Sequence, residues 1–317
     1  MNNFASNRRV RTLRWLLVVT ALPFTSFSWA AETPIAVIYP DIGEPYREVF
    51  KNIIGGIEDK VGSPLVNYPV RSNTDIDALK SSLQRQNTKV VIALGRQGML
   101  TAALLDHNFW VVGGGVLTVP ESGVHEQAVI SLTPDPVLLF TQLKALMPTA
   151  KRVFAVYDPD NNGWLMKLAN DAARAQGLEL IAYEAHDVRS AVNFYQEIFA
   201  MADSRRDALW LPQDASTVEE TSILPLVLQS SWNKNIAVFS SNSAHVRRGV
   251  LFSLYPNNAA LGKSLAGLAQ DFLTSGSPQR GMLPLRDVQV AVNLRTAKHL
   301  GLNVSKQQNF DLTFPEQ

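Results

Sequence analysis

The chain has 317 residues, contains no cysteine and carries a formal charge of +1 at pH 7. Without cysteine it has no disulfide bond, no thiolate metal ligand, no cysteine nucleophile and no lipid-bearing cysteine. Residues 1–30 hold four arginines and no acid, so residues 31–317 carry −3 and lack the basic patch typical of nucleic-acid binding.

The first 30 residues are organised like a secretory signal peptide. Arginines between positions 8 and 14 form a positive head, and residues 15–27 form an uncharged, mostly apolar stretch. Ser28 and Ala30 place small residues at the two positions that a signal peptidase reads. We expect Sec-dependent export, cleavage after Ala30 and a periplasmic location. The alternative, an uncleaved membrane anchor, fits less well because the stretch is short for a bilayer.

Residues 31–132 alternate apolar, β-branched runs with amphipathic segments. In residues 44–60, for example, the apolar side chains recur at helical spacing. Thr74 or Asp75 is a plausible cap for the helix that follows it. We expect strands over residues 35–39, 65–70, 90–95, 110–114 and 128–132, and helices over residues 44–60, 75–86 and 96–106.

Residues 133–136 (Thr-Pro-Asp-Pro) break this series, and the alternation then restarts. The helix expected over residues 258–276 contains Ala259, Gly262, Ala266 and Gly267, whose small side chains permit close packing. Gly301 is a C-terminal stop signal. We expect strands over residues 152–157, 178–183, 208–212, 236–240, 250–255 and 289–294, and helices over residues 137–147, 162–176, 190–202, 217–232, 258–276 and 296–300.

Apolar strands joined by helix-length crossovers predict parallel sheets covered on both faces. Residues 31–317 exceed what one hydrophobic core usually serves. The predicted fold class is therefore α/β, with two doubly wound, Rossmann-like lobes joined by a hinge. We expect one lobe over residues 31–133 plus roughly 257–288, and the other over residues 134–256 plus roughly 289–317.

Parallel sheets bind ligands beyond the carboxyl ends of their strands, and here those ends are rich in Asp, Asn, Ser, Thr, Gln and Gly. Each loop taken alone is explained by ordinary turn and capping preferences. Six such loops on one edge favour a binding cleft instead. The candidate ligand-binding residues are Tyr39, Gly95, Arg96, Gln97, Thr118, Asn161, Asn162, Trp164, Asp214, Ser241 and Asn242.

Several of these candidates have a second interpretation. Asp214 either pairs with a ligand ammonium or caps the helix expected from Thr217. Trp164 either flanks a ligand or belongs to the core, and Tyr39 either stacks on a ligand or faces the core. Arg96 either holds a carboxylate bidentately or is an ordinary solvated arginine. Replacing Asp214 by alanine is expected to weaken ligand binding without unfolding the protein.

Motifs typical of enzymes are missing from the sequence. It contains no nucleophile elbow, no phosphate-binding loop and no dinucleotide fingerprint, and the glycines at 113–115 are weak evidence alone. The five histidines have no metal-binding spacing. We expect no catalytic residue, no metal and no cofactor. An exported α/β hydrolase is kept as the alternative from another functional class.

Several segments resemble one known family. They are residues 146–153 leading into 156–159, residues 175–180, residues 207–214 and, most specifically, residues 292–302 (Val-Asn-Leu-Arg-Thr-Ala-Lys-His-Leu-Gly-Leu). The chain resembles the ABC-transporter substrate-binding proteins whose characterised members take up tryptophan and related amino acids, with a periplasmic binding protein type I fold. It departs from the family pattern at Arg96, where a Thr or Ser is usual, and at Asn242, where an acid is frequent.

The resemblance implies a monomer that captures a small polar solute, such as an amino acid or an aromatic amino-acid-like compound, between two lobes. It implies hinge crossovers near residues 132–136, 255–258 and 285–292. It also implies that Asp214, which matches an aspartate of the family in the equivalent strand-end loop, contacts the ligand. The expected partner is the membrane permease of an ABC importer. A sensory membrane receptor is the alternative partner, and no nucleic acid is expected.

Overall fold

The computed structural model describes Met1 and residues 34–105, 108–119, 127–275, 279–304 and 310–315. Residues Thr33–Gln317 form one compact unit that is distinct from Met1–Glu32. The predicted signal peptide and its cleavage site lie outside the described residues. None of the helices in the described ranges is both long and apolar enough to cross a membrane.

The first sheet is parallel throughout and has the strand order β11-β5-β4-β3-β1-β2. Its last element in the chain, β11, pairs with β5 at the sheet edge. The strands are β1 (Ile35–Pro40), β2 (Val66–Val70), β3 (Val90–Leu94), β4 (Trp110–Val116), β5 (Ala128–Pro134) and β11 (Gly281–Leu285).

The second sheet has the order β13-β12-β10-β9-β8-β6-β7 and is parallel except where β10 pairs with β12. The sequence predicted only parallel pairing. The antiparallel pair arises because the chain enters β12 directly from β11, without a helix that would reverse its direction. The strands are β6 (Arg152–Tyr157), β7 (Glu179–Glu184), β8 (Asp207–Leu211), β9 (Ala237–Ser240), β10 (Phe252–Pro256), β12 (Val288–Asn293) and β13 (Leu312–Phe314).

Both sheets are buried on both faces, which explains their nearly unbroken apolar strands. In β1, Ile35 and Val37 belong to one core cluster and Ala36 and Ile38 to another. Neighbouring β6 residues divide between two further clusters in the same way. The helices that cover these faces are α1 (Tyr46–Val61), α2 (Ile76–Arg85), α3 (Gly95–Ala102), α4 (Pro136–Leu146), α5 (Pro159–Ala175), α6 (Val188–Met201), α7 (Ile223–Lys234), α8 (Ala244–Arg248), α9 (Asn258–Ser275) and α10 (Leu294–His299).

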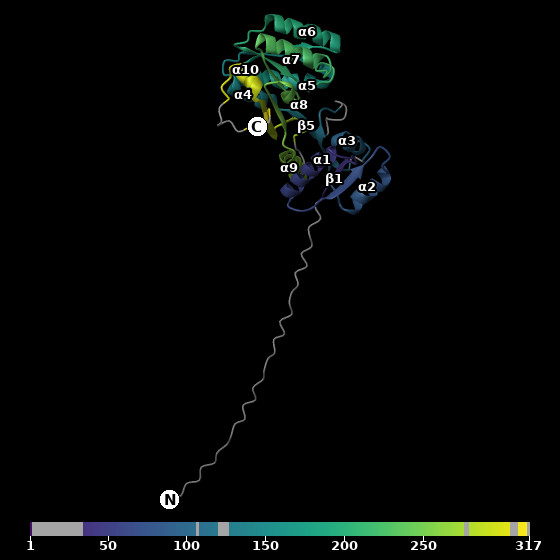
Figure 1. The fold of residues 1–317 in the computed structure, drawn as a ribbon. Coiled ribbons are helices and arrows are strands. Elements are labelled where there is room, and N and C mark those ends of the chain that lie inside the picture. Colours follow the sequence, from purple (N-terminus) through teal and green to yellow (C-terminus); the bar gives the residue numbers. More distant parts are fainter. Residues whose placement is uncertain (2–33, 106–107, 120–126, 276–278, 305–309, 316–317) are drawn as a thin grey trace. The chain divides into compact units, whose positions relative to one another are not determined.

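Helices α1 and α9 pack side by side although some 200 residues separate them in the chain (Figure 1). A Cβ atom on Gly56 would collide with the Ala259 carbonyl, and one on Gly262 would collide with the Ile53 carbonyl. Close packing through Ala259 and Gly262 is therefore confirmed. Gly267 has open space around its Cα and plays no part in this contact.

Several helix boundaries differ from the prediction, and the reason is identifiable for the starts of α5 and α7. Helix α5 begins at Pro159 because Asp158 caps it and proline suits the first helical position. Helix α7 begins only at Ile223, since Pro225 is tolerated in a first turn but not six residues further in. Helix α3 ends at Ala102, ahead of the expected end near 106, a position outside the described residues.

Three short elements were not predicted at all. Strand β11 is an edge strand interrupted by Pro284, where its register with β5 shifts. Helix α8 and strand β13 have only five and three residues. Elements this short have too few residues to display a periodicity.

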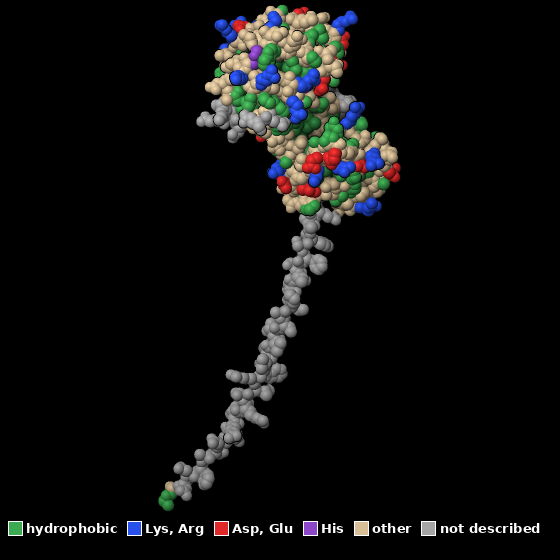
Figure 2. Space-filling view, viewed as in Figure 1, with side chains coloured by type: hydrophobic (Ala, Val, Ile, Leu, Met, Phe, Trp, Pro, Cys, Tyr) green, Lys and Arg blue, Asp and Glu red, His purple; other side chains and the backbone are tan. Residues whose placement is uncertain are grey.

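The chain passes between the sheets in three places, after β5, after β10 and after β11. Hydrogen bonds join these crossovers: the Asp135 amide donates to the Leu285 carbonyl (2.8 Å) and the Asn257 amide to the Asp287 carbonyl (2.9 Å). The division into two hinged lobes remains our interpretation of this connectivity. Figure 2 shows acidic and basic side chains interspersed over the visible face.

Candidate functional site

The strongest cluster of polar side chains lies where β6 and β8 end, at the carboxyl edge of the second sheet. These strands are adjacent and parallel, so the loops that follow them meet. The β6 loop supplies Asp158, and the first turn of α5 supplies Asn161 and Asn162. The β8 loop supplies Asp214 and Ser216.

Asp214 is buried, with 6% of its surface exposed. Its Oδ2 accepts hydrogen bonds from the Asp158 amide (2.8 Å) and from Asn162 Nδ2 (2.9 Å). Its Oδ1 accepts from the Ser216 amide (3.1 Å), with Asn161 Nδ2 at 3.4 Å. An ionised carboxylate has about four acceptor positions, so protein donors occupy nearly all of them. Asp214 therefore joins two loops and has little capacity left for a ligand.

Asp158 has more acceptor capacity left than Asp214. Its Oδ1 accepts from the Asp160 amide (3.0 Å), and its Oδ2 lies 3.0 Å from Ser216 Oγ. Ser216 Oγ also lies 2.8 Å from Asp214 Oδ1, but the hydroxyl has one hydrogen and can serve only one carboxylate at a time. Two carboxylates share one donor here, and a further donor would be accommodated at Asp158.

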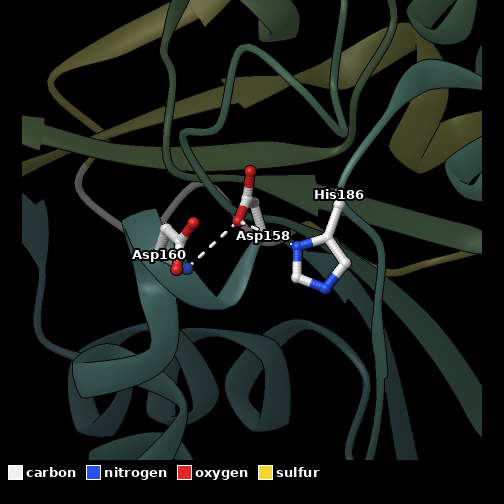
Figure 3. Close-up of side chains that lie close together, drawn as sticks. All are labelled: Asp158, Asp160 and His186. Atoms are coloured by element: carbon white, nitrogen blue, oxygen red, sulfur yellow. Dashed lines mark hydrogen bonds and ion pairs between the residues drawn. The ribbon is translucent and has the colours of Figure 1, made fainter.

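Figure 3 shows Asp158 between Asp160 and His186, which comes from the loop after β7. His186 Nδ1 lies 3.9 Å from Asp158 Oδ1, and its side chain is largely exposed. These three residues bring one ligand atom each within 4.8 Å of one another, a spacing compatible with a cation. Exposed acidic groups also adopt such spacings without a metal, and His186 supplies a weak partner for the Asp158 carboxylate.

Asn161, Asn162 and Trp164 all lie in the first turns of α5. The sequence predicted Asn162 and Trp164 in a helix starting at residue 162, but it predicted Asn161 in the preceding loop. Asn162 is buried and serves Asp214, whereas Asn161 is half-buried. Trp164 packs against the core cluster beneath α4 and α5, in agreement with its interpretation as a core residue. Its Nε1 is buried and finds no acceptor among the described residues.

The loop after β9 uses its polar groups internally. Ser241 is buried, and its hydroxyl accepts from Trp210 Nε1 at 3.1 Å. Asn242 donates its amide to Ser240 Oγ (3.0 Å) and accepts from Ala244 N through Oδ1 (3.0 Å). These contacts fix the loop, and the half-buried Asn242 is the better placed of the two candidates to meet a ligand.

His245 anchors the same loop from below. Its Nδ1 lies 2.9 Å from Ser240 Oγ, and only 3% of the residue is exposed. Burial lowers the pKa of His245 below its usual 6.5, although the negative charge of Glu220 opposes this shift. A buried Ser-His pair of this kind is inaccessible to a substrate and holds the turn together.

At the carboxyl edge of the first sheet, α3 starts immediately where β3 ends. Gly95 has φ +65° and is packed against Phe50 and Pro40, and no side chain caps the helix. Among the described residues no N-cap side chain accepts from the first amides of α3, which makes these amides candidates for an external acceptor. Arg96 is exposed in this turn, and Gln97 is half-buried beside Thr101.

Tyr39 and Thr118 lie at the same edge. Tyr39 is half-buried near the end of β1 and contacts the core cluster, and Thr118 is exposed after β4. Sequence reasoning missed a second property of this edge. Apolar side chains of its loops and of α3 are exposed, although the sheet below is tightly packed. At the edge itself they are Ile42 (38%), Tyr46 (65%) and Leu117 (37%), with Leu100 (53%) further along α3.

The sequence profile described as ABC transporter substrate binding protein matches residues 134–309, more than half of the chain. No curated protein sequence matches the chain. The matched region contains the β6, β8 and β9 loops described above.

Three solved structures share the fold. A ligand-free, open substrate binding protein with adhesive properties from Clostridium difficile is 15% identical (TM-score 0.62, covering 88% of this chain and 98% of that one). A conserved domain protein from Vibrio cholerae is 17% identical (TM-score 0.52, covering 88% and 98%). An ABC domain in complex with L-Trp from Streptococcus pneumonia is 17% identical (TM-score 0.50, covering 86% and 95%). The predicted α/β fold class is confirmed.

Proposed function

We propose, from the premise that this chain belongs to the ABC transporter substrate binding protein family, that it captures a zwitterionic amino acid with an apolar or aromatic side chain. The family consists of binding proteins and not of enzymes. The observation that carries the proposal is the spare acceptor capacity of Asp158, beside a fully engaged Asp214.

The ammonium group of the ligand is assigned to Asp158. An ammonium has three donors and no acceptor, and the two carboxylates at this edge share the single hydrogen of Ser216. A charge-assisted hydrogen bond from the ligand would release Ser216 to serve Asp214. Asn161 and Ser216, both half-buried, line the same position and add orientation.

The carboxylate of the ligand is assigned to the start of α3. Its uncapped amides carry the positive end of the helix dipole, which favours a negative group. Arg96 in the same turn adds a mobile positive charge. The exposed apolar side chains nearby, Tyr46 and Leu117 among them, supply contact for an apolar ligand body. The L-Trp held by the Streptococcus pneumonia structure is a ligand of this kind.

Three indole compounds test this assignment group by group. L-tryptophan carries both charges, tryptamine lacks the carboxylate and indole-3-propionate lacks the ammonium. At a hundred times its dissociation constant, a ligand stabilises by about 2.7 kcal/mol, which thermal unfolding detects readily. We expect an amino acid to raise the midpoint and each truncated analogue to bind at least about tenfold more weakly.

A panel of the other amino acids extends the test to the ligand side chain. Lack of any shift with all amino acids would contradict the proposal, as would equal binding of tryptamine and L-tryptophan. The Asp158→Asn variant should lose its preference for the charged amine. Recovery of the ligand unchanged would separate binding from hydrolysis.

We further propose that the protein is exported to the periplasm as a monomer and delivers its solute to the permease of an ABC importer. Family membership supports an extracytoplasmic location, and the arginine-headed N-terminal sequence supports export. Deletion of the gene for the permease that it serves should abolish uptake of the ligand. Uptake that persists, together with a lost transcriptional response, would indicate the sensory alternative.

A further inference from the structure

We propose that a cavity at the amino edge of the second sheet binds an organic anion, a ligand with an apolar body and a carboxylate or phosphate group. The cavity has a volume of about 730 Å³. It is formed by the last turns of α7, the end of α8, the short helix α10 and the end of β13. This proposal is independent of the amino-acid site above.

The cavity lies away from the loops after β6, β8 and β9. Ile236 precedes β9, and Gly249 precedes β10, which runs parallel to β9. Asn293 ends β12, which is antiparallel to β10, and its amide donates to the Leu251 carbonyl at 2.8 Å. All three residues therefore mark the edge opposite to the carboxyl ends of the parallel strands.

The charged lining of this cavity is cationic. Arg247, Arg248 and Arg295 line it, and no Asp or Glu is found in the described part of the lining. The rest of the chain after residue 30 is mildly acidic, so this concentration of positive charge is local. A concave surface with charges of one sign attracts ligands of the opposite sign.

Arg295 is assigned as the principal anion ligand, while Arg247 lies over the ring of Phe314 at 5.4 Å. Arg248 is engaged by Glu220, donating to its carbonyl at 3.1 Å, with the carboxylate at 3.8 Å. Arg295 lies over the ring of Trp232 at 5.7 Å, and the described residues offer it no carboxylate. An exposed guanidinium held by an aromatic face keeps its donors free for a planar or tetrahedral oxyanion.

The uncharged residues that line the cavity indicate what kind of ligand body would fit it. The ring of His299 stacks on Trp232 at 3.6 Å, and the Trp232 carbonyl lies 3.0 Å from His299 Nε2, so this pair is a fixed wall. Leu228, Ile236, Leu300 and Phe314 contribute apolar surface. Thr296 Oγ1 donates to the Gly249 carbonyl (2.8 Å) and is already satisfied. The volume is that of a small-molecule site and far exceeds a bare inorganic ion.

Three naphthalene compounds with one body and different charges test the proposal by calorimetry. The probes are 1-naphthoate, 1-naphthyl phosphate and the cationic 1-naphthylmethylamine. We expect at least one anion to bind and the amine not to bind, and the two anions to distinguish a carboxylate from a phosphate ligand. The affinity should fall as salt concentration rises.

Variants locate the binding. Arg295→Gln should weaken anion binding at least about tenfold. Its thermal midpoint should match that of the control Lys167→Gln, which removes an exposed charge from α5. Asp158→Asn should leave anion binding unchanged, which separates this cavity from the amino-acid site. The proposal is overturned if none of the probes binds, if the amine binds as well as the anions, or if Arg295→Gln binds within twofold of the wild type.

Discussion

Replacing Asp214 by alanine should lower the free energy of unfolding, because the Asp214 carboxylate accepts hydrogen bonds from the protein and makes no direct contact with the ligand. The carboxylate is 6% exposed and accepts from two buried donors, the Asp158 amide and Asn162 Nδ2. Each buried donor left without an acceptor costs about 1–3 kcal/mol, so the variant should lose about 2–6 kcal/mol of unfolding free energy. At roughly 2 °C per kcal/mol, the melting midpoint should fall by at least about 4 °C.

Two further variants make this reasoning testable by differential scanning calorimetry and ligand titration. Asp158→Asn keeps the shape of its side chain and should remain stable while the affinity for an amino acid falls at least about tenfold. Glu197→Gln removes an exposed carboxylate from α6 and should change neither property. The reasoning would be refuted by an Asp214→Ala protein that unfolds at the wild-type midpoint and yet no longer binds the ligand. That result would indicate that Asp214 contacts the ligand directly.

Three other predictions concern stability. Gly262→Ala should cost about 1–3 kcal/mol in urea unfolding because the new methyl meets the Ile53 carbonyl, whereas Gly267→Ala, with open space, should be neutral or stabilising. Burial raises the pKa of Asp207, but hydrogen bonds and charges around it, first of all from Arg152, hold the folded pKa below 3.8. The contribution of this carboxylate to the free energy of unfolding should therefore be complete above pH 3.8 and decline on further acidification. Unfolding titrations of Asp207→Asn should lack this contribution. The pKa of His245 lies below 6.5 in the folded protein, so on acidification this imidazole is protonated in the unfolded chain before it is protonated in the folded one. The free energy of unfolding should therefore decline as the pH falls below 6.5. Unfolding titrations of His245→Gln should show less of this decline.

The sequence was sufficient for the architecture because the strands are buried on both faces. The run Val90–Leu94 is fully apolar, and such a run has few alternatives to a central parallel strand. The edges were harder to predict. Strand β11 carries Pro284 and pairs on one side only, so its residues lack the composition of a central strand.

The candidate site was predictable as a region but not in its roles. The strand-end rule located Asp158 and Asp214 at one edge of the sheet. Nothing in the local sequence indicates that the Asp214 carboxylate receives donors from a segment more than 50 residues away. Which of two acids keeps an open acceptor depends on tertiary pairing, and Ser216, which stands between them, had no sequence signal of its own.

Strand β11 belongs to the first sheet but comes late in the chain, and this limits how the chain can be cut into fragments that fold. Strand β5 ends at Pro134, and its edge partner begins at Gly281, so the first sheet closes only after roughly 150 intervening residues have been placed, a slow non-local step. A fragment ending at Pro134 would lack both β11 and α9, leaving the apolar face of α1 uncovered. We therefore expect such a fragment to aggregate, and the two sheets to be inseparable by truncation or by domain exchange between relatives. The segment from α9 to β11 would have to be transferred together with the N-terminal strands for a chimaera to fold.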